Sequence, residues 1–131
     1  MPNKVKFNKE FPVIKKSEKL FNRSNGLIPA NTQTLAKGPT QWINGIAPKY
    51  LKSGKGSHVW DVDGNEYIDY NMGIGPLVLG YCYEKVDKAI IKQLKRGITF
   101  SLVHPLEVEL SEKIREVILI YPKFFSQSFL P

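Results

Sequence analysis

The sequence predicts an α+β chain made of a short helix, a long loop, a β-hairpin, a glycine-rich loop and two further helices. Two observations support this fold class. Asp63-Gly64 separates two short runs rich in Val, Trp, Tyr and Ile, which is a strong hairpin signal. Apolar side chains then recur at helical spacing over residues 84–96 and 105–118. We therefore expect strands before residue 70 and helices after residue 84.

The first part of the chain shows little regular pattern. Residues 1–16 mix lysines with scattered apolar side chains and predict a mobile basic arm. Ser17 is expected to cap a short helix that ends near Ser24. Residues 27–48 contain three prolines and two glycines among polar side chains, which predicts a loop rather than a packed helix or a central strand. Loops of this length usually carry function or are disordered.

The hairpin is expected within residues 57–70, after an edge strand at 50–52. A two-residue turn would place Trp60 opposite Tyr67, an aromatic pair that stabilises a hairpin. The same register would also bring two carboxylates, those of Asp61 and Glu66, face to face. Because that pairing is repulsive, a longer turn with a bulge is the alternative.

Two helices are expected after the glycine-rich segment. The first starts with acidic side chains at residue 84, has basic side chains in its last turn and stops at Gly97, as the helix dipole and a C-cap favour. The second starts at Pro105, because proline is tolerated in the first turn. The two apolar faces consist of Val86, Ala89, Ile90 and Leu94, and of Leu106, Leu110, Ile114 and Val117 or Ile118.

Residues 119–131 break this pattern. They carry one charge and three Phe, and we expect an aberrant apolar tail of the kind that a shifted reading frame or a premature end of a gene would produce. The chain is therefore divided into a basic arm at 1–16, a main segment at 17–118 and this tail.

The composition excludes several classes of function. Residues 1–60 carry eleven Lys or Arg against two Glu, whereas residues 61–131 carry eight basic and ten acidic side chains. The lysines are scattered and do not alternate with aromatic residues, so the pattern does not favour binding to nucleic acid. No apolar run reaches the about 20 residues of a membrane span. A lone cysteine, Cys82, is typical of a cytoplasmic protein.

No metal site emerges from the sequence. His58 and His104 have no Cys or His neighbour at metal-ligand spacing. We expect His58 to pair with Asp69 across the hairpin and His104 to start the second helix. Asp61 and Asp63 suggest calcium, but the Glu that closes a calcium-binding loop is missing, so a turn is the better interpretation.

The hairpin, the segment 73–80 (Gly-Ile-Gly-Pro-Leu-Val-Leu-Gly) and the segment 105–110 (Pro-Leu-Glu-Val-Glu-Leu) occur in this order and resemble the N-terminal part of class III pyridoxal-phosphate aminotransferases. The nearest branch is that of glutamate-1-semialdehyde 2,1-aminomutase. The resemblance runs from about residue 17 to about residue 118. It implies the α/β fold of pyridoxal-phosphate-dependent transferases (fold type I), of which this chain would be an N-terminal α+β fragment. It also implies a homodimer that transfers an amino group on an amino acid, a semialdehyde or a sugar.

The resemblance implies that the catalytic residues are absent from this chain. In the family, the Schiff-base lysine, the carboxylate at the pyridine nitrogen and the phosphate-binding turn all follow the matched part. No lysine here matches the Schiff-base motif, so no catalytic residue is assigned. We expect the fragment to be inactive and not to bind pyridoxal phosphate alone. A non-catalytic truncated gene product and a small basic binding module are the alternative functions.

The resemblance also assigns substrate-side roles. Gly73, Ile74 and Gly75 match a segment that lines the substrate pocket, where the aminomutase branch often has Ser-Trp-Gly, which puts specificity for glutamate semialdehyde in doubt. Thr34 and Lys37 fall near a hydroxyl and an arginine that binds the substrate carboxylate. A lysine can pair with an anion but lacks the bidentate fork of arginine. An ordinary turn and an exposed loop lysine are the alternatives.

A third segment, Thr99, Phe100 and Ser101, matches residues that lie at the dimer interface close to the partner's active site in the family. The alternative is a simple connection between two helices.

Overall fold

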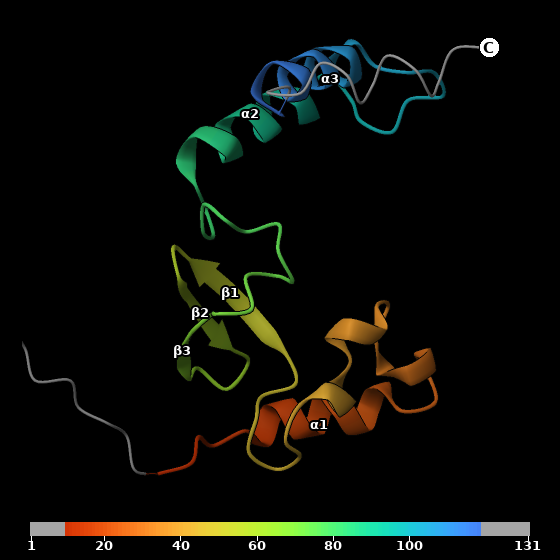
Figure 1. The fold of residues 1–131 in the computed structure, drawn as a ribbon. Coiled ribbons are helices and arrows are strands. Elements are labelled where there is room, and N and C mark those ends of the chain that lie inside the picture. The colour runs from red at the N-terminus through yellow and green to blue at the C-terminus, as the bar shows by residue number, and fades with distance from the viewer. Residues whose placement is uncertain (1–9, 119–131) are drawn as a thin grey trace, which may run out of the picture. The chain divides into compact units, whose positions relative to one another are not determined.

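The computed structural model describes residues 10–118 (Figure 1). The elements follow the predicted order. They are α1 (Lys15–Ser24), the short 3₁₀ turns η1 (Pro29–Asn31), η2 (Leu35–Lys37) and η3 (Pro39–Gln41), the strands β1 (Leu51–Lys55), β2 (His58–Asp61) and β3 (Glu66–Ile68), and the helices α2 (Glu84–Leu94) and α3 (Pro105–Ile118).

The chain divides after Lys88 into two compact units. The first holds α1, the 3₁₀ turns and the sheet, and the second holds most of α2 and all of α3. Most of the predicted arm and the whole predicted tail at 119–131 lie outside the described residues. In the part of the chain that the structure describes, no helix has the length and apolar character needed to cross a bilayer.

Helix α1 is capped by a distant carboxylate rather than by the expected serine. The backbone N–H groups of Lys16 and Ser17 donate to the two carboxylate oxygens of Asp63 at 2.7 and 2.9 Å. A carboxylate here satisfies orphan donors and complements the positive end of the helix dipole. The prediction that Ser17 caps the helix was wrong. Its side chain is buried inside α1, where the hydroxyl accepts the N–H of Lys49 at 2.8 Å.

Residues 27–48 form neither a packed helix nor a strand, as predicted, but three single 3₁₀ turns order them. The buried Ser24, at the end of α1, connects this loop to the helix through hydrogen bonds of its side chain. Its Oγ lies 2.8 Å from Asn31 Oδ1 and 2.9 Å from Tyr50 Oη. A residue at each end of the loop is thereby tied to the same helix.

The three strands form one antiparallel sheet in the order β1-β2-β3. The two-residue turn was the wrong choice, because Trp60 pairs with Glu66 and it is Val59 that faces Tyr67. Residues 62–65 form a longer connection, which confirms the longer turn of the alternative interpretation; the register shift that is seen lies between Leu51 and Ser53, in the pairing of β1 with β2. The first strand runs to Lys55 and is therefore longer than the sequence indicated.

The predicted pairing of His58 with Asp69 is also wrong. His58 lies opposite Ile68, and its Nδ1 is 2.8 Å from a carboxylate oxygen of Glu66 on the neighbouring strand. The cause is the longer connection, which shifts the partner of every β2 residue by one position along β3.

The turn between β2 and β3 is organised by Asp61, whose side chain is 1% exposed. Its carboxylate accepts the N–H of Asp63, the N–H and side-chain amide of Asn65, and the hydroxyl of Tyr67, at 2.8–3.0 Å. Burial alone would raise the pKa of Asp61, but the hydrogen bonds, led by those from Asn65, outweigh it and lower this pKa below its ordinary value. Burial and the bond to Asp61 raise the pKa of Tyr67.

Helices α2 and α3 confirm the periodicity of the sequence. His104 starts α3 as predicted: its N–H donates to Glu107 Oε1 at 2.8 Å, and its Nδ1 accepts the N–H of Leu106 at 3.1 Å. This reciprocal arrangement is that of a capping box. No residue of α2 or of the described α3 is buried. Among the described residues, the buried apolar side chains are Ile14, Pro39 and Val59, all in the first unit.

Candidate functional site

The candidate site is built on the segment 69–81, here called the glycine loop, which leaves β3 and returns to the sheet. Tyr81 forms a two-hydrogen-bond bridge with Gly56, at 2.8 Å in each direction. Its ring covers Gly54, where a Cβ would lie 2.5 Å from the ring. A Cβ on Gly80 would come within 2.7 Å of the carbonyl oxygen of Gly56. Glycines at these positions let the loop close on the sheet.

The predicted pocket residues lie at the start of this loop in an unusual conformation. Met72, Gly73, Ile74 and Gly75 have φ values of 47°, 62°, 67° and 109°, four left-handed residues in succession. Glycine adopts such angles readily, whereas a β-branched residue such as Ile74 is strained there. Strain of this kind is often found at ligand-binding segments.

The left-handed run leaves several backbone groups available to a ligand. Among the described residues, the N–H of Gly73 and the carbonyl oxygens of Gly73, Ile74 and Gly75 form no hydrogen bond. By contrast, the N–H groups of Ile74 and Gly75 are used within the turn, by Asn71 and Met72. Residues 73–75 can therefore offer one backbone donor and three backbone acceptors.

Two residues that the sequence analysis did not assign to the site fasten the loop. The Oδ2 of Asp69 accepts the hydroxyl of Tyr81 at 2.7 Å, and its Oδ1 accepts the N–H groups of Asn71 and Met72. Burial, with the bond to Asp69 and the charge of this carboxylate, raises the pKa of Tyr81 to about 12. The sequence pattern that could have identified this pair is an acidic residue just before the glycine-rich segment, Asp69, and an aromatic residue just after it, Tyr81.

A hollow of about 290 Å³ lies between the loop and the sheet. It is lined by Gly56, Ser57, Asp69, Met72, Leu77, Val78, Leu79, Gly80 and Tyr81. The predicted residues 73–75 are next to this lining but not part of it.

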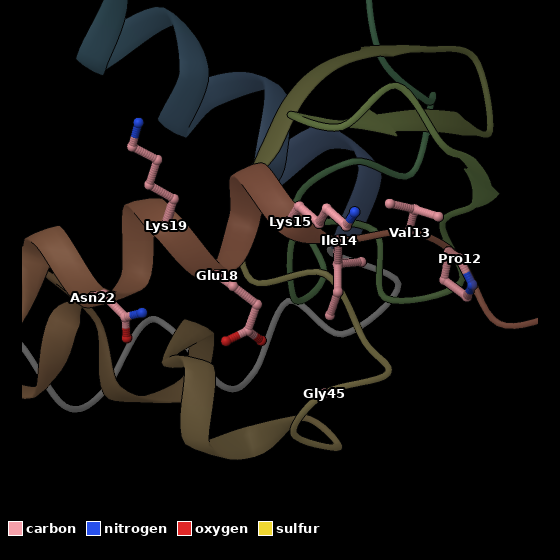
Figure 2. A pocket seen from close by; sticks show the side chains of 8 residues that line it. All are labelled: Pro12, Val13, Ile14, Lys15, Glu18, Lys19, Asn22 and Gly45. Atoms are coloured by element: carbon pink, nitrogen blue, oxygen red, sulfur yellow. The ribbon is translucent and has the colours of Figure 1, made fainter.

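A larger and more open hollow, of about 610 Å³, lies along one side of α1 (Figure 2). Pro12, Val13 and Ile14 line it on the side of the arm, and Gly45 lines it on the side of the loop. No sequence prediction concerned this surface. The side chain of Glu18 in its wall is already paired with Lys49, so the hollow offers no free carboxylate there.

Thr34 and Lys37 lie together at η2. The N–H of Lys37 donates to the carbonyl oxygen of Thr34 at 2.9 Å, and Thr32 Oγ1 bonds both backbone groups of Thr34. The Lys37 side chain is exposed. Within residues 10–118, no hydrogen bond or ion pair joins these two residues to 73–75, so a shared site stays a prediction.

Thr99, Phe100 and Ser101 belong to the second unit and connect α2 to α3. The ring of Phe100 stacks on His104, with centroids 5.3 Å apart, and Thr99 has a φ of 59°. Phe100 is 50% exposed. The segment is therefore ordered by the cap of α3, and its predicted place at a dimer interface is not tested by these contacts.

That this chain alone lacks a site for pyridoxal phosphate stays a prediction. A site of this kind needs a lysine free to react with the aldehyde of the cofactor. Lys49 is the least exposed described lysine, but its Nζ is bound to Glu18 and Asn44 and lies 4.4 Å from the ring centre of Phe21. The other described lysines are exposed. No group of three or more His, Cys, Asp or Glu within residues 10–118 could hold a metal ion.

Comparisons with known proteins identify the class of fold to which the sheet and the glycine loop belong. The family model of class-III aminotransferases matches residues 44–130, more than half of the chain. The solved structure of a transaminase with PLP bound has a TM-score of 0.69 and 28% sequence identity, over 80% of this chain and 24% of that one. The chain belongs to the class III aminotransferase family.

Two curated relatives define the relationship further. Glutamate-1-semialdehyde 2,1-aminomutase of Thermus thermophilus is 46% identical over 76% of this chain and 23% of its own length. The 3-aminobutyryl-CoA aminotransferase of Cloacimonas acidaminovorans is 37% identical over 80% of this chain and 25% of its own length. The chain thus spans about a quarter of these relatives. It is an N-terminal α+β piece of the aminotransferase fold, as the sequence predicted.

Proposed function

We propose that this chain is the N-terminal part of a pyridoxal-phosphate-dependent aminotransferase or aminomutase. The whole enzyme would move an amino group on an amino acid, a semialdehyde or a sugar, and the chain alone would be inactive. The observation that carries the proposal is the class III match over residues 44–130, combined with a chain that spans about a quarter of its relatives.

The glycine loop gives the proposal its site. It would supply one free backbone donor and three free acceptors from 73–75 and is joined to the sheet through Tyr81, which suits the rim of a substrate pocket. Lys37 would pair with an anionic group of the substrate from the loop at 27–48, and Thr34 would add a hydroxyl. In a homodimer, residues 99–101 would lie near the partner's site.

The division of the chain into an arm, a main segment and a tail, as predicted from the sequence, is part of this proposal. Residues 17–118 would be the aminotransferase segment, with 1–16 as a basic arm, whose last two residues already belong to α1, and 119–131 as an aberrant tail. The family match extends to residue 130, which gives a reason to test the last boundary by deletion.

A chimera tests the proposal. Residues 17–118 would replace the corresponding N-terminal segment of the Thermus thermophilus aminomutase, and binding of pyridoxal phosphate and amino-group transfer would be measured. We expect a folded dimer that binds the cofactor. We also expect Lys37→Ala in the chimera to raise KM for an anionic substrate more than it lowers kcat, because Lys37 would bind the substrate and not the reacting atoms.

The matched control is Lys52→Ala, an exposed lysine on β1 that is assigned no role. A folded chimera that fails to bind pyridoxal phosphate would contradict the aminotransferase assignment. A Lys37 variant with the kinetics of the Lys52 variant would remove the proposed role of Lys37 alone.

A further inference from the structure

One carboxylate fastens both ends of the glycine loop. Asp69 Oδ1 accepts the N–H groups of Asn71 and Met72 at 2.9 and 3.1 Å, at the start of the loop. Its Oδ2 accepts the hydroxyl of Tyr81 at 2.7 Å, twelve residues further along the chain. We propose that Asp69 and Tyr81 are positioning residues that hold Met72–Gly75 in the left-handed conformation required of a substrate-pocket rim.

The loop needs such a fastening because its conformation is costly. Met72 and Ile74 both carry a Cβ and both have positive φ values, 47° and 67°. Non-glycine residues keep such φ angles only where contacts with the surrounding structure hold them in place. The hydrogen bonds from Asn71 and Met72 to Asp69 end at the first residue of the left-handed run, so they act where the strain begins.

The partner of Asp69 is itself rigidly placed. The Tyr81 backbone is bridged to Gly56, and its ring rests on Gly54, so the hydroxyl position is set by the sheet. This hydroxyl is protonated at neutral pH and donates to the carboxylate; burial and this hydrogen bond raise the pKa of Tyr81. A hydrogen bond to a charged acceptor is about twice as strong as one between neutral groups. The pair thus connects the sheet to the loop.

The role of the loop at a substrate pocket rests on the proposed function, whereas the fastening itself does not. Amide hydrogen exchange of the full chain, followed by NMR, separates the two because it needs neither substrate nor cofactor. An inactive chimera would overturn the proposed function and leave the exchange result standing.

The main variant is Tyr81→Phe, which removes the hydroxyl and keeps the ring on Gly54. We expect exchange at the amides of Met72 and Ile74 to rise about tenfold, the size expected for loss of a hydrogen bond to a charged group. Exchange at Trp60 and Tyr67 in the sheet should not change. The control is Tyr70→Phe, since Tyr70 is 86% exposed and adjacent to Asp69.

Two substitutions of Asp69 test whether an acceptor at this position is enough to restore the protection of the loop amides. Asp69→Ala should raise exchange at the amides of Asn71 and Met72 at least as much as Tyr81→Phe does. Asp69→Asn should restore most of their protection, because an amide oxygen still accepts from both N–H groups. The proposal is overturned if Tyr81→Phe leaves the loop amides unchanged, or if exchange in the sheet rises equally.

Discussion

Two carboxylates, two residues apart, serve different partners in the turn of the hairpin. Asp61 points inward and shapes the turn, whereas Asp63 points toward α1 and caps it. Asn65 joins the two roles, since its side-chain amide donates both to Asp61 and to the carbonyl oxygen of Val13 at 2.8 Å. A four-residue connection thus holds a helix that lies 46 residues earlier in the chain.

Replacing the cap should destabilise the first unit. Asp63→Ala removes the acceptor for Lys16 and Ser17, and we expect the free energy of unfolding to fall by about 1–2 kcal/mol. Asp63→Asn should lose less, because asparagine caps helices about as well as aspartate. Urea denaturation followed by circular dichroism measures both. Equal losses for the two variants would show that the cap is not the cause.

Because the pKa of Asp61 is lowered in the folded chain, the free energy of unfolding depends on pH in the acidic range. Because the folded pKa lies below that of the unfolded chain, about 3.9, the stabilising contribution is present above that value and is lost as the pH falls through the folded pKa. We expect the urea midpoint to fall when the pH drops below about 5. The same titration in Asp61→Asn is the comparison.

Asp61→Asn should be less stable at neutral pH and less sensitive to acid. Its amide group would face the donors of Asn65 and Tyr67, so at least one donor loses its acceptor. An acid dependence as steep as that of the parent chain would assign the effect to other carboxylates.

At the scale of elements, the turn of the hairpin depends on a glycine. Gly64 has a φ of 98° and no atom that would clash with a Cβ, so any cost of substitution comes from the backbone alone. We expect Gly64→Val to cost about 1–3 kcal/mol of unfolding free energy, and Gly64→Asn less, because asparagine tolerates positive φ better. Thermal melts would measure the difference. Equal stability of the two variants would argue against the strain.

The apolar faces of α2 and α3 are exposed to solvent. In α2, Ile90, Ile91 and Leu94 are each more than half exposed. Contiguous apolar surface of this kind usually marks an interface or leads to self-association. We expect sedimentation of the isolated chain to depend on its concentration. The double variant Ile90→Gln and Leu94→Gln should reduce that dependence, whereas Lys92→Gln on the same helix should not. A parent chain that sediments as a monomer at every concentration would contradict this expectation.

For the whole molecule, we expect the isolated chain not to bind the cofactor of the family as a Schiff base. Mixing the chain with pyridoxal phosphate, reducing with borohydride and mapping the peptides should show only scattered, partial labelling of exposed lysines. The reason is that Lys49, the one largely covered lysine of residues 10–118, is engaged by Glu18 and Asn44. Stoichiometric labelling of one lysine would contradict the prediction.

The kinds of elements, their order and the family could all be predicted from the amino-acid sequence. These features depend on short-range patterns: the turn at Asp63-Gly64, the helical periodicity after residue 84, the cap that His104 forms with its neighbours, and the ordered motifs behind the resemblance. Each can be recognised locally, because the residues that cause it lie within a few positions of one another.

The register of the hairpin, the cap of α1 and the attachment of the glycine loop depend on long-range contacts that the sequence did not reveal. The register followed the hydrogen bonds of a buried Asp61, and the cap came from Asp63 rather than from Ser17. The loop is held by Tyr81 through contacts with the sheet and with Asp69. A side chain with several possible partners binds the one that folding brings within reach, and separation along the chain does not reveal which one that is.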